Sequence, residues 1–186
     1  MLAISGINLA AFFATYLGDY DWVPAAVLFA SWETLYMVFL STAVSYLLGM
    51  PLAIILVTSE KGHILENLQL NQVLGSIVNA VRSLPFIILL ILAIPFTRWV
   101  VGTSIGTVAS IVPLSLAAIP FVARLVETSL KEIDWGLIEA ALSMGASNWQ
   151  IISKVLLPEA MPSVVLGVAI TAINLVGYSA MAGVLG

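Results

Sequence analysis

Residues 35–59 read LYMVFLSTAVSYLLGMPLAIILVTS and contain no charged side chain. A helix needs about 20 consecutive apolar residues to cross the hydrocarbon core of a bilayer, so this stretch is long enough to span a membrane. The composition of the whole chain agrees, because 61% of its 186 residues are hydrophobic and only 9% are charged. A soluble domain typically has about a quarter of its residues charged. The sequence therefore predicts an integral membrane protein.

Other apolar runs extend this pattern along the chain. Residues 99–123 and 160–186 are also free of charge, and residues 75–97 are interrupted only by Arg82. We expect Arg82 near an interface, with its side chain reaching the headgroups. The predicted fold is an all-α, polytopic bundle of transmembrane helices that forms a single domain over residues 1–186. Its four spans lie at about residues 33–58, 75–97, 104–126 and 160–184.

The basic residues predict the orientation of these spans. Five of them fall on one side of a four-span arrangement, and only Arg98 falls on the other: Lys61, Arg82, Arg124, Lys131 and Lys154. Loops rich in Lys and Arg stay in the cytoplasm, which places residues 59–74 and 124–159 there. Residues 1–24 have an apolar run without a basic region before it, so we expect an interfacial helix rather than a signal peptide.

Composition also excludes several function classes. The chain has no cysteine, a single histidine and only six basic residues, which argues against thiolate metal sites and nucleic-acid binding. It also lacks the G-x-x-x-x-G-K-[ST] loop that cradles nucleotide phosphates. We therefore expect no catalytic residue, no metal and no cofactor. We interpret His63 as an ordinary solvated loop residue.

Residues 134–158 form a half-polar segment between two long apolar runs. Asp134 is a plausible N-cap, Gly145 is suited to end the first helix, and Ser147 with Gln150 matches a capping box for the second. Pro158 is expected to end that second helix. The segment therefore predicts a pair of short cytoplasmic helices joined by a sharp turn. An amphipathic helix lying on the bilayer is the alternative, although such helices usually carry more basic residues.

The same segment resembles the EAA signature of ABC-type importer permeases. The matching residues are Glu139-Ala140-Ala141, then Gly145, then Val155-Leu156-Leu157-Pro158, where the usual pattern has Ile at the position of Val155. The resemblance implies that this helix pair couples the permease to a cytoplasmic ATPase subunit. The implied coupling residues are Glu139, Ala140, Ala141, Gly145, Ala146, Leu157 and Pro158. Glu139 is alternatively a simple helix-capping charge.

Further stretches look like the permeases of methionine importers. They are WETL at 32–35, RSLPFIILL at 82–90, IPFTR at 94–98, VGTSIG at 101–106 and VGYSAM at 176–181. The resemblance implies a multi-pass protein of the cell inner membrane that passes methionine, including D-methionine, inward by alternating access. It also implies that two copies pair, that partner subunits hydrolyse ATP, and that an external binding protein delivers the substrate.

The resemblance leaves other transport functions open. An importer permease for another small solute is the first alternative, and a secondary transporter or channel is the second. Transporters of the latter kinds commonly carry charges at the centres of their spans, which the long charge-free runs here do not. The methionine importer permeases usually have another span after VGYSAM, so we expect the parent gene to continue beyond Gly186.

The last span offers candidates for the substrate pathway. Asn174, Tyr178 and Met181 fall on one helical face at i, i+4 and i+7, beside Ser179. Polar side chains inside a span must face protein or water. These four residues are our candidates for lining the path. Contacts that only join neighbouring helices are an equally plausible role.

Overall fold

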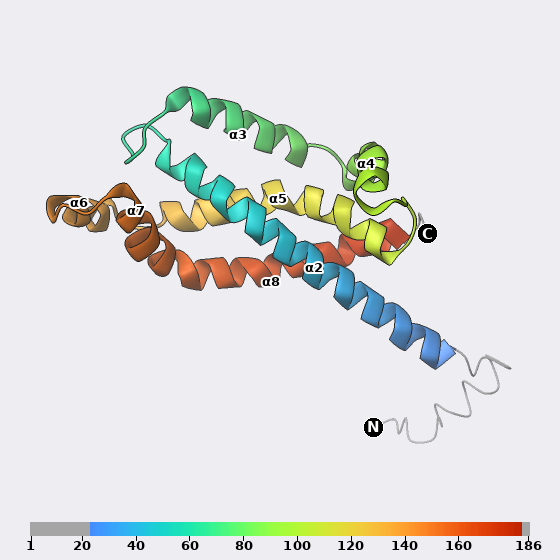
Figure 1. The fold of residues 1–186 in the computed structure, drawn as a ribbon. Coiled ribbons are helices and arrows are strands. Elements are labelled where there is room, and N and C mark those ends of the chain that lie inside the picture. The colour runs from blue at the N-terminus through green and yellow to red at the C-terminus, as the bar shows by residue number, and fades with distance from the viewer. Residues whose placement is uncertain (1–22, 184–186) are drawn as a thin grey trace, which may run out of the picture. The chain divides into compact units, whose positions relative to one another are not determined.

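The computed structural model describes residues 23–183, and this part of the chain consists of helices joined by short loops and turns, without a strand (Figure 1). The elements are α2 (Val23–Thr58), α3 (Leu68–Arg82), α4 (Phe86–Val101), α5 (Thr107–Lys131), α6 (Trp135–Ser143), α7 (Asn148–Ile151), the π-helical η1 (Ile152–Leu156) and α8 (Leu157–Ala182). The predicted all-α membrane fold is confirmed. The interfacial helix expected over 1–24 lies, except for its last two residues, outside the described residues, as does residue 184 of the last predicted span.

The chain divides into two compact units, residues 1–34 and 35–186. The described residues of the first unit form the beginning of α2. There the Ser31 and Thr34 hydroxyls donate to the carbonyls of Val27 and Ala30, four residues earlier in the helix. These bonds satisfy polar groups within the helix itself. The features below all belong to the second unit.

Helix α2 crosses α5 at close range, because small residues occupy every fourth position of one α2 face: Ser41, Ser45, Gly49 and Ala53, all buried. The Ser45 hydroxyl donates to the Ser115 carbonyl across the crossing at 3.3 Å. A Cβ added to Gly49 would lie 2.9 Å from the carbonyl oxygen of Ile119. Small residues at such intervals let the backbones of membrane helices approach.

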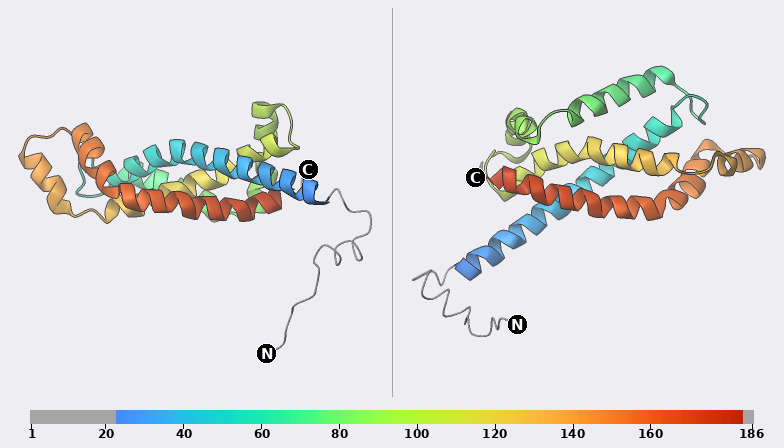
Figure 2. Two further views of the ribbon diagram at one scale, coloured as in Figure 1. Left: turned by 90° about the horizontal axis from the view of Figure 1, so that it is seen from below. Right: turned by 180° about the vertical axis from the view of Figure 1, so that it is seen from behind.

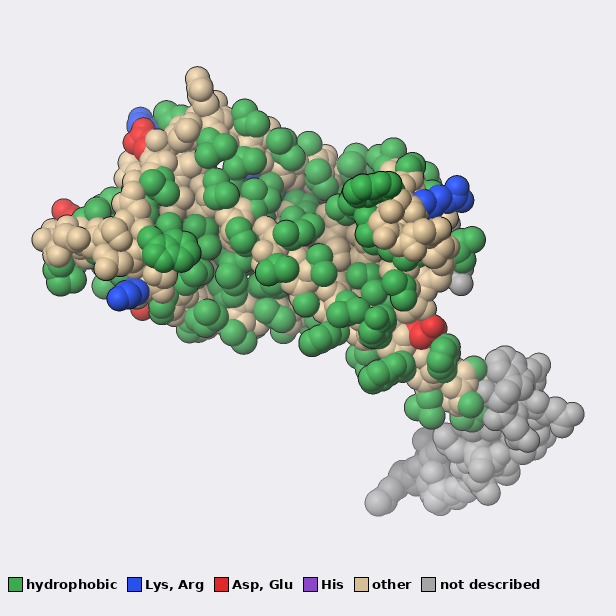
Figure 3. Space-filling model, viewed as in Figure 1, with side chains coloured by type: hydrophobic (Ala, Val, Ile, Leu, Met, Phe, Trp, Pro, Cys, Tyr) green, Lys and Arg blue, Asp and Glu red, His purple; other side chains and the backbone are tan. Residues whose placement is uncertain are grey.

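Helices α5 and α8 lie side by side and form the centre of this unit (Figures 1 and 2). Two clusters of buried side chains fill the space around them. One lies towards α6 and α7 and contains Val126, Leu156 and Val164, and the other surrounds Leu114 and Leu175. Hydrophobic side chains also cover much of the outer face in Figure 3, as expected of helices that contact lipid.

The span predicted over residues 75–97 is not one helix. The structure has α3 and α4 there, bent by 107° at residues 83–85. Pro85 is the cause, because a proline disfavours helical geometry at the residue before it and cannot donate a backbone hydrogen bond. Three helical stretches are therefore long and apolar enough to span a membrane, or four if the bent pair counts as one span.

The structure shows which side chains surround Arg82, whereas its expected position near an interface stays a prediction. The guanidinium of Arg124 donates to the Gly75 carbonyl at 3.1 Å, which fixes the alignment of α3 against α5. Arg82 ends α3 further along and lines a cavity with Ala117 of α5. Ala117 is about 15 Å along α5 from Thr107 and about 21 Å from Lys131, at 1.5 Å per residue. Arg82 thus shares a cavity with the middle part of α5.

Pro158 does not end the second short helix, contrary to expectation. The helix runs without interruption from Asn148 to Ala182. Residues Ile152–Leu156 widen into a π-helical turn directly before the proline, with the Leu157 amide donating to the Ile152 carbonyl. A wider turn reduces the steric conflict between a proline ring and the carbonyl four residues earlier. The helix after the sharp turn is therefore continuous with the last span.

Candidate coupling surface and membrane cavities

The turn at Gly145 is held by main-chain hydrogen bonds that end α6. The Gly145 amide donates to the Leu142 carbonyl at 2.9 Å, and the Ala146 amide donates to the Ala141 carbonyl at 3.0 Å. Together they form a Schellman motif, which requires a left-handed residue after the helix. Gly145 supplies it with φ of 79°. At the other end of α6, the Asp134 carboxylate accepts from the Gly136 amide at 2.6 Å, so the predicted N-cap is confirmed.

A capping box begins the next helix directly after this turn. The Gln150 amide donates to the Ser147 hydroxyl at 3.3 Å, and the Ser147 amide donates to the Gln150 side chain at 2.8 Å. The capping box predicted from the sequence is therefore confirmed. Since hydrogen bonds fix both sides of residues 144–147, the turn is presented in one defined shape.

The predicted coupling segment, residues 134–158, has one buried and one exposed side. Ile138 and Ala141 are buried against Ile151 and Leu156. Large apolar side chains face outward around the turn, with exposed fractions of 82% for Met144 and 71% for Trp149. A Cβ added to Gly145 would meet no atom within 4 Å. The turn thus projects into open space and is surrounded by an exposed apolar surface, which is typical of a site for another protein.

The predicted coupling residues lie partly on the buried side and partly on the exposed side of this segment. Ala141 is buried, Ala146 and Leu157 are half-buried, and the remaining four are exposed: Glu139, Ala140, Gly145 and Pro158. Glu139 does not cap α6, because Asp134 accepts the capping hydrogen bond. The exposed members leave their outward surface available for a partner.

Sequence reasoning missed that the loop between α2 and α3 supports this segment. The ring of His63 lies edge-on to Trp135, with 5.3 Å between the ring centroids. The Asn148 side chain donates to the Ile64 carbonyl at 3.4 Å, and Ile64 packs on the buried cluster. The expectation of a solvated His63 is therefore wrong. Burial lowers the pKa of its imidazole, and the charge of Lys131 acts in the same direction, whereas Glu60 opposes them.

An ion-pair network at the same end of the bundle was also missed. The buried Glu127 carboxylate accepts from Arg124 at 2.6 Å and lies 3.0 Å from Lys131. Lys131 also pairs with Glu60 of the loop at 3.0 Å. Arg124, Glu127 and Lys131 stand at i, i+3 and i+7, a spacing that places them on one face of α5. That spacing was the available signal in the sequence.

The predicted pathway residues do not all meet. Asn174 and Tyr178 line one cavity of about 50 Å³ with Phe121 and Thr171. The Tyr178 ring also stacks on Phe86, with 4.6 Å between the ring centroids. Ser179 is buried and donates to a carbonyl of its own helix. Met181 is 46% exposed and lines none of the cavities described here.

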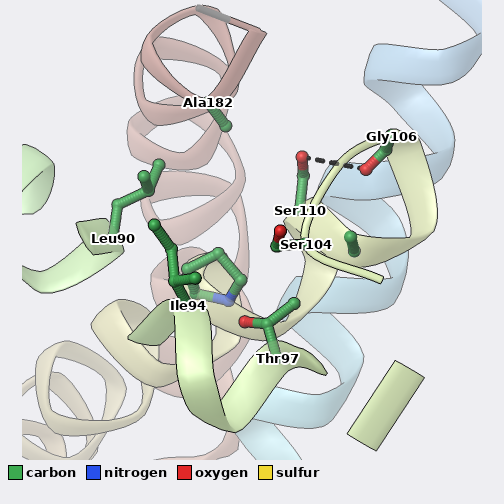
Figure 4. A pocket seen from close by; sticks show the side chains of 9 residues that line it. Leu90, Ile94, Thr97, Ser104, Gly106, Ser110 and Ala182 are labelled. Carbon is green, nitrogen blue, oxygen red and sulfur yellow. Dashed lines mark hydrogen bonds between the residues drawn. The ribbon is translucent and has the colours of Figure 1, made fainter. Parts of the chain in front are cut away.

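Two further cavities are lined by α4, α5 and α8, and the larger one also by the end of α3. One of about 190 Å³ is lined by Arg82, Phe86, Phe121 and Tyr178, so it shares two aromatic side chains with the cavity at Asn174. The other has about 20 Å³ and lies where Leu90, Ile94 and Thr97 of α4 face Ala182 (Figure 4). The smaller space holds about one water molecule, which leaves no room for a solute. Among the described residues, no group of His, Cys, Asp and Glu could hold a metal ion.

Proteins with closely similar sequences are transport permeases. The chain is similar to a probable D-methionine transport system permease protein of Vibrio cholerae, with 56% identity over 160 residues that cover 86% of this chain and 71% of that protein. It is also similar to the D-methionine transport system permease protein of Escherichia coli K12, with 53% identity over 152 residues that cover 82% of this chain and 70% of the relative.

Solved structures show the same fold. An inward-facing form of the MetNI methionine ABC transporter matches with a TM-score of 0.82 and 53% identity, covering 83% of this chain and 72% of that one. The sequence pattern of the family described as binding-protein-dependent transport system inner membrane component matches residues 46–186. The predicted importer-permease relationship is therefore confirmed, and the chain belongs to this family of multi-pass inner membrane transport components.

Proposed function

We propose that this chain is the membrane-spanning subunit of an ATP-driven importer that passes methionine, including D-methionine, into the cell. The observation that carries the proposal is the turn at Gly145, which two capping motifs hold in an exposed apolar surface. Relatives that are 53–56% identical are named as D-methionine permeases, which supports the choice of substrate. ATP hydrolysis belongs to a partner subunit.

The coupling surface binds that ATPase subunit on the cytoplasmic side. Four of its residues are exposed and therefore accessible to the ATPase subunit: Glu139, Ala140, Gly145 and Pro158. Because the helix from Asn148 to Ala182 is continuous, a displacement of the turn moves the last span with it. ATPase closure is thereby converted into a change of access between the two sides of the membrane.

Two copies of the chain pair, and an extracytoplasmic binding protein delivers the substrate to them. Asn174 and Tyr178 line the path near the centre of the bundle, where they share a cavity. Ser179 and Met181 lie further along α8, and Met181 is exposed at the surface of the single chain. In a pair of chains, such an exposed side chain is available to the second copy.

The test of this function is Gly145→Trp in the importer complex. Open space around Gly145 accommodates the side chain in the permease alone, and the left-handed backbone adds a cost of about 1–2 kcal/mol. We expect normal membrane insertion, but loss of ATPase co-purification and of methionine uptake, because the bulk blocks docking. Normal uptake by this variant would show that residues 134–158 are not the coupling segment.

Gly102→Trp is the matched control. Gly102 ends α4 with φ of 84° and also has no atom within 4 Å of an added Cβ. The same strain and bulk are thus placed away from the coupling surface, and we expect uptake and ATPase co-purification to persist. An importer for another solute is distinguished in proteoliposomes, where methionine-loaded binding protein should stimulate ATP hydrolysis above the rate with other amino acids.

A further inference from the structure

Arg82 is a charged residue beside the middle part of a predicted membrane span. It lies at the bend between α3 and α4 and lines a cavity with Ala117, near the middle of α5. The hydrocarbon core of a bilayer is about 30 Å thick, so a position about 15 Å along a span is close to its centre. An ionised side chain at that depth is costly unless it faces water, an opposite charge or a ligand.

The other two arginines have partners within the chain, whereas Arg82 has none among residues 23–183. Arg98 donates to the Ser104 hydroxyl at 3.1 Å. Arg124 pairs with Glu127 and also donates to the Gly75 carbonyl. Among the described residues, none accepts a hydrogen bond from Arg82 or forms an ion pair with it. Its guanidinium is therefore free to bind an anionic group from outside the chain.

The cavity beside Arg82 has a shape and a chemistry that suit a small amphiphilic molecule. Its volume of about 190 Å³ is roughly nine times that of the cavity at Ala182, which has about 20 Å³. Phe86, Phe121 and Tyr178 line it, and the parallel stack of Phe86 on Tyr178 forms part of the wall. Phe121 and Tyr178 also line the cavity at Asn174, so the two spaces adjoin the same pair of rings.

We propose that Arg82 binds the α-carboxylate of the transported amino acid during its passage through the membrane. This inference rests on the proposed importer function. A guanidinium binds a carboxylate through two parallel hydrogen bonds, which fixes the orientation of the substrate. The apolar end of the substrate then lies against the aromatic wall, where a thioether makes favourable contacts with ring edges.

The bend between α3 and α4 gives this site its place. If residues 75–97 formed one straight helix, Arg82 would lie within a continuous helix, about 10 Å from its start. Because α3 ends there and Pro85 begins α4 at 107° to it, the guanidinium is at the end of a helix beside the cavity. Broken helices at membrane depth are tolerated where they line a cavity, and such breaks commonly mark solute sites.

Arg82→Gln and Arg82→Lys test the site in the reconstituted importer. Arg82→Gln removes the charge, and we expect kcat/KM for methionine uptake to fall ~10- to 100-fold. Arg82→Lys keeps the charge but lacks the paired donors of a guanidinium. We therefore expect this variant to retain part of the uptake, with a raised KM. ATPase co-purification should persist in both variants. Arg98→Gln is the matched control, because it removes a guanidinium from the far end of α4 and should retain uptake.

A second measurement reads binding without relying on transport. The chain contains no cysteine, so an Ala117→Cys variant places one thiol in the wall of the cavity that Arg82 also lines. We expect an anionic methanethiosulfonate reagent to label it faster than a cationic one, and Arg82→Gln to abolish that preference. Methionine should slow labelling, whereas methioninamide, which lacks the carboxylate, should not.

The outcomes separate this inference from the proposed function. If the unmodified importer takes up no methionine, the proposed function fails and the carboxylate site fails with it. If it takes up methionine and Arg82→Gln retains uptake within about twofold, only the carboxylate site is refuted. Equal slowing by methionine and methioninamide, or absence of labelling at position 117, would also refute the site.

Discussion

His63 lies between α2 and α3 and is half-buried against Trp135 of α6. Its Nδ1 accepts a hydrogen bond from the Ile64 amide at 3.0 Å, which only the unprotonated nitrogen can do. Burial lowers the pKa of the imidazole below its ordinary value of 6.5. Burial and the hydrogen bond from Ile64 thus both favour the neutral ring. At the residue scale, the loop that supports the coupling segment therefore depends on a neutral histidine.

This histidine predicts a pH dependence of stability. The folded-state pKa is lowered, so its stabilising contribution is complete above about pH 6.5 and is lost as the pH falls through the folded-state pKa. We expect the melting temperature of the detergent-solubilised protein to fall between about pH 7.5 and pH 5.5. His63→Gln should show a smaller fall over the same range. An identical pH profile for the two proteins would contradict the prediction.

At the scale of elements, the crossing of α2 over α5 depends on having no side chain at Gly49. An added Cβ would lie 2.9 Å from the Ile119 carbonyl oxygen and 2.9 Å from a methyl carbon of Val122. Backbone oxygen cannot move without displacing its helix, so the contact cannot be relieved by a rotamer change. The small residues along this face of α2 thus determine how closely the two helices pack.

We expect Gly49→Ala to destabilise the protein by about 1–3 kcal/mol, because it over-packs this crossing. The measurement is the melting temperature in detergent. Gly177→Ala in α8 is the control, since an added Cβ there meets no atom within 4 Å. That variant should be neutral or slightly stabilising, because alanine favours a helix over glycine by up to about 1 kcal/mol. Equal effects of the two variants would refute the close-crossing interpretation.

At the scale of the whole molecule, Glu127 connects parts that are distant in the sequence. It pairs with Arg124, which also binds the Gly75 carbonyl of α3. It also pairs with Lys131, which reaches Glu60 in the loop after α2. Through these contacts one buried carboxylate joins α5, α3 and the loop beside the coupling segment.

Glu127→Gln should therefore weaken several contacts at once. An amide cannot neutralise Arg124 and Lys131, and loss of a charge-assisted contact of this kind costs about 2 kcal/mol. We expect a lower melting temperature and lower uptake per folded molecule, because the support of the coupling segment loosens. Glu132→Gln is the control, because Glu132 is exposed and makes no ion pair among the described residues. A melting temperature equal to that of this control would contradict the prediction.

Local rules were enough to predict a large part of this structure from the sequence. Long charge-free runs predict membrane helices, because backbone polar groups in lipid must be satisfied within a helix. Asp134, Gly145 and Ser147 predict the ends of α6 and the start of α7, because capping uses side chains within a few residues. The spacing of the EAA-like residues indicates the family, since it lies within one continuous stretch of chain.

The remaining features depend on contacts between distant residues, which only the tertiary structure decided. The neighbours of Arg82 could not be predicted, because periodicity does not tell which helices meet, whereas the packing of α3 on α5 brings it to a cavity that Ala117 also lines. Pro158 was expected to end a helix, but the π-helical turn before it lets the helix continue. His63 is half-buried because Trp135 folds back against it. Each of these outcomes follows from which surfaces meet, and a local sequence pattern does not determine that.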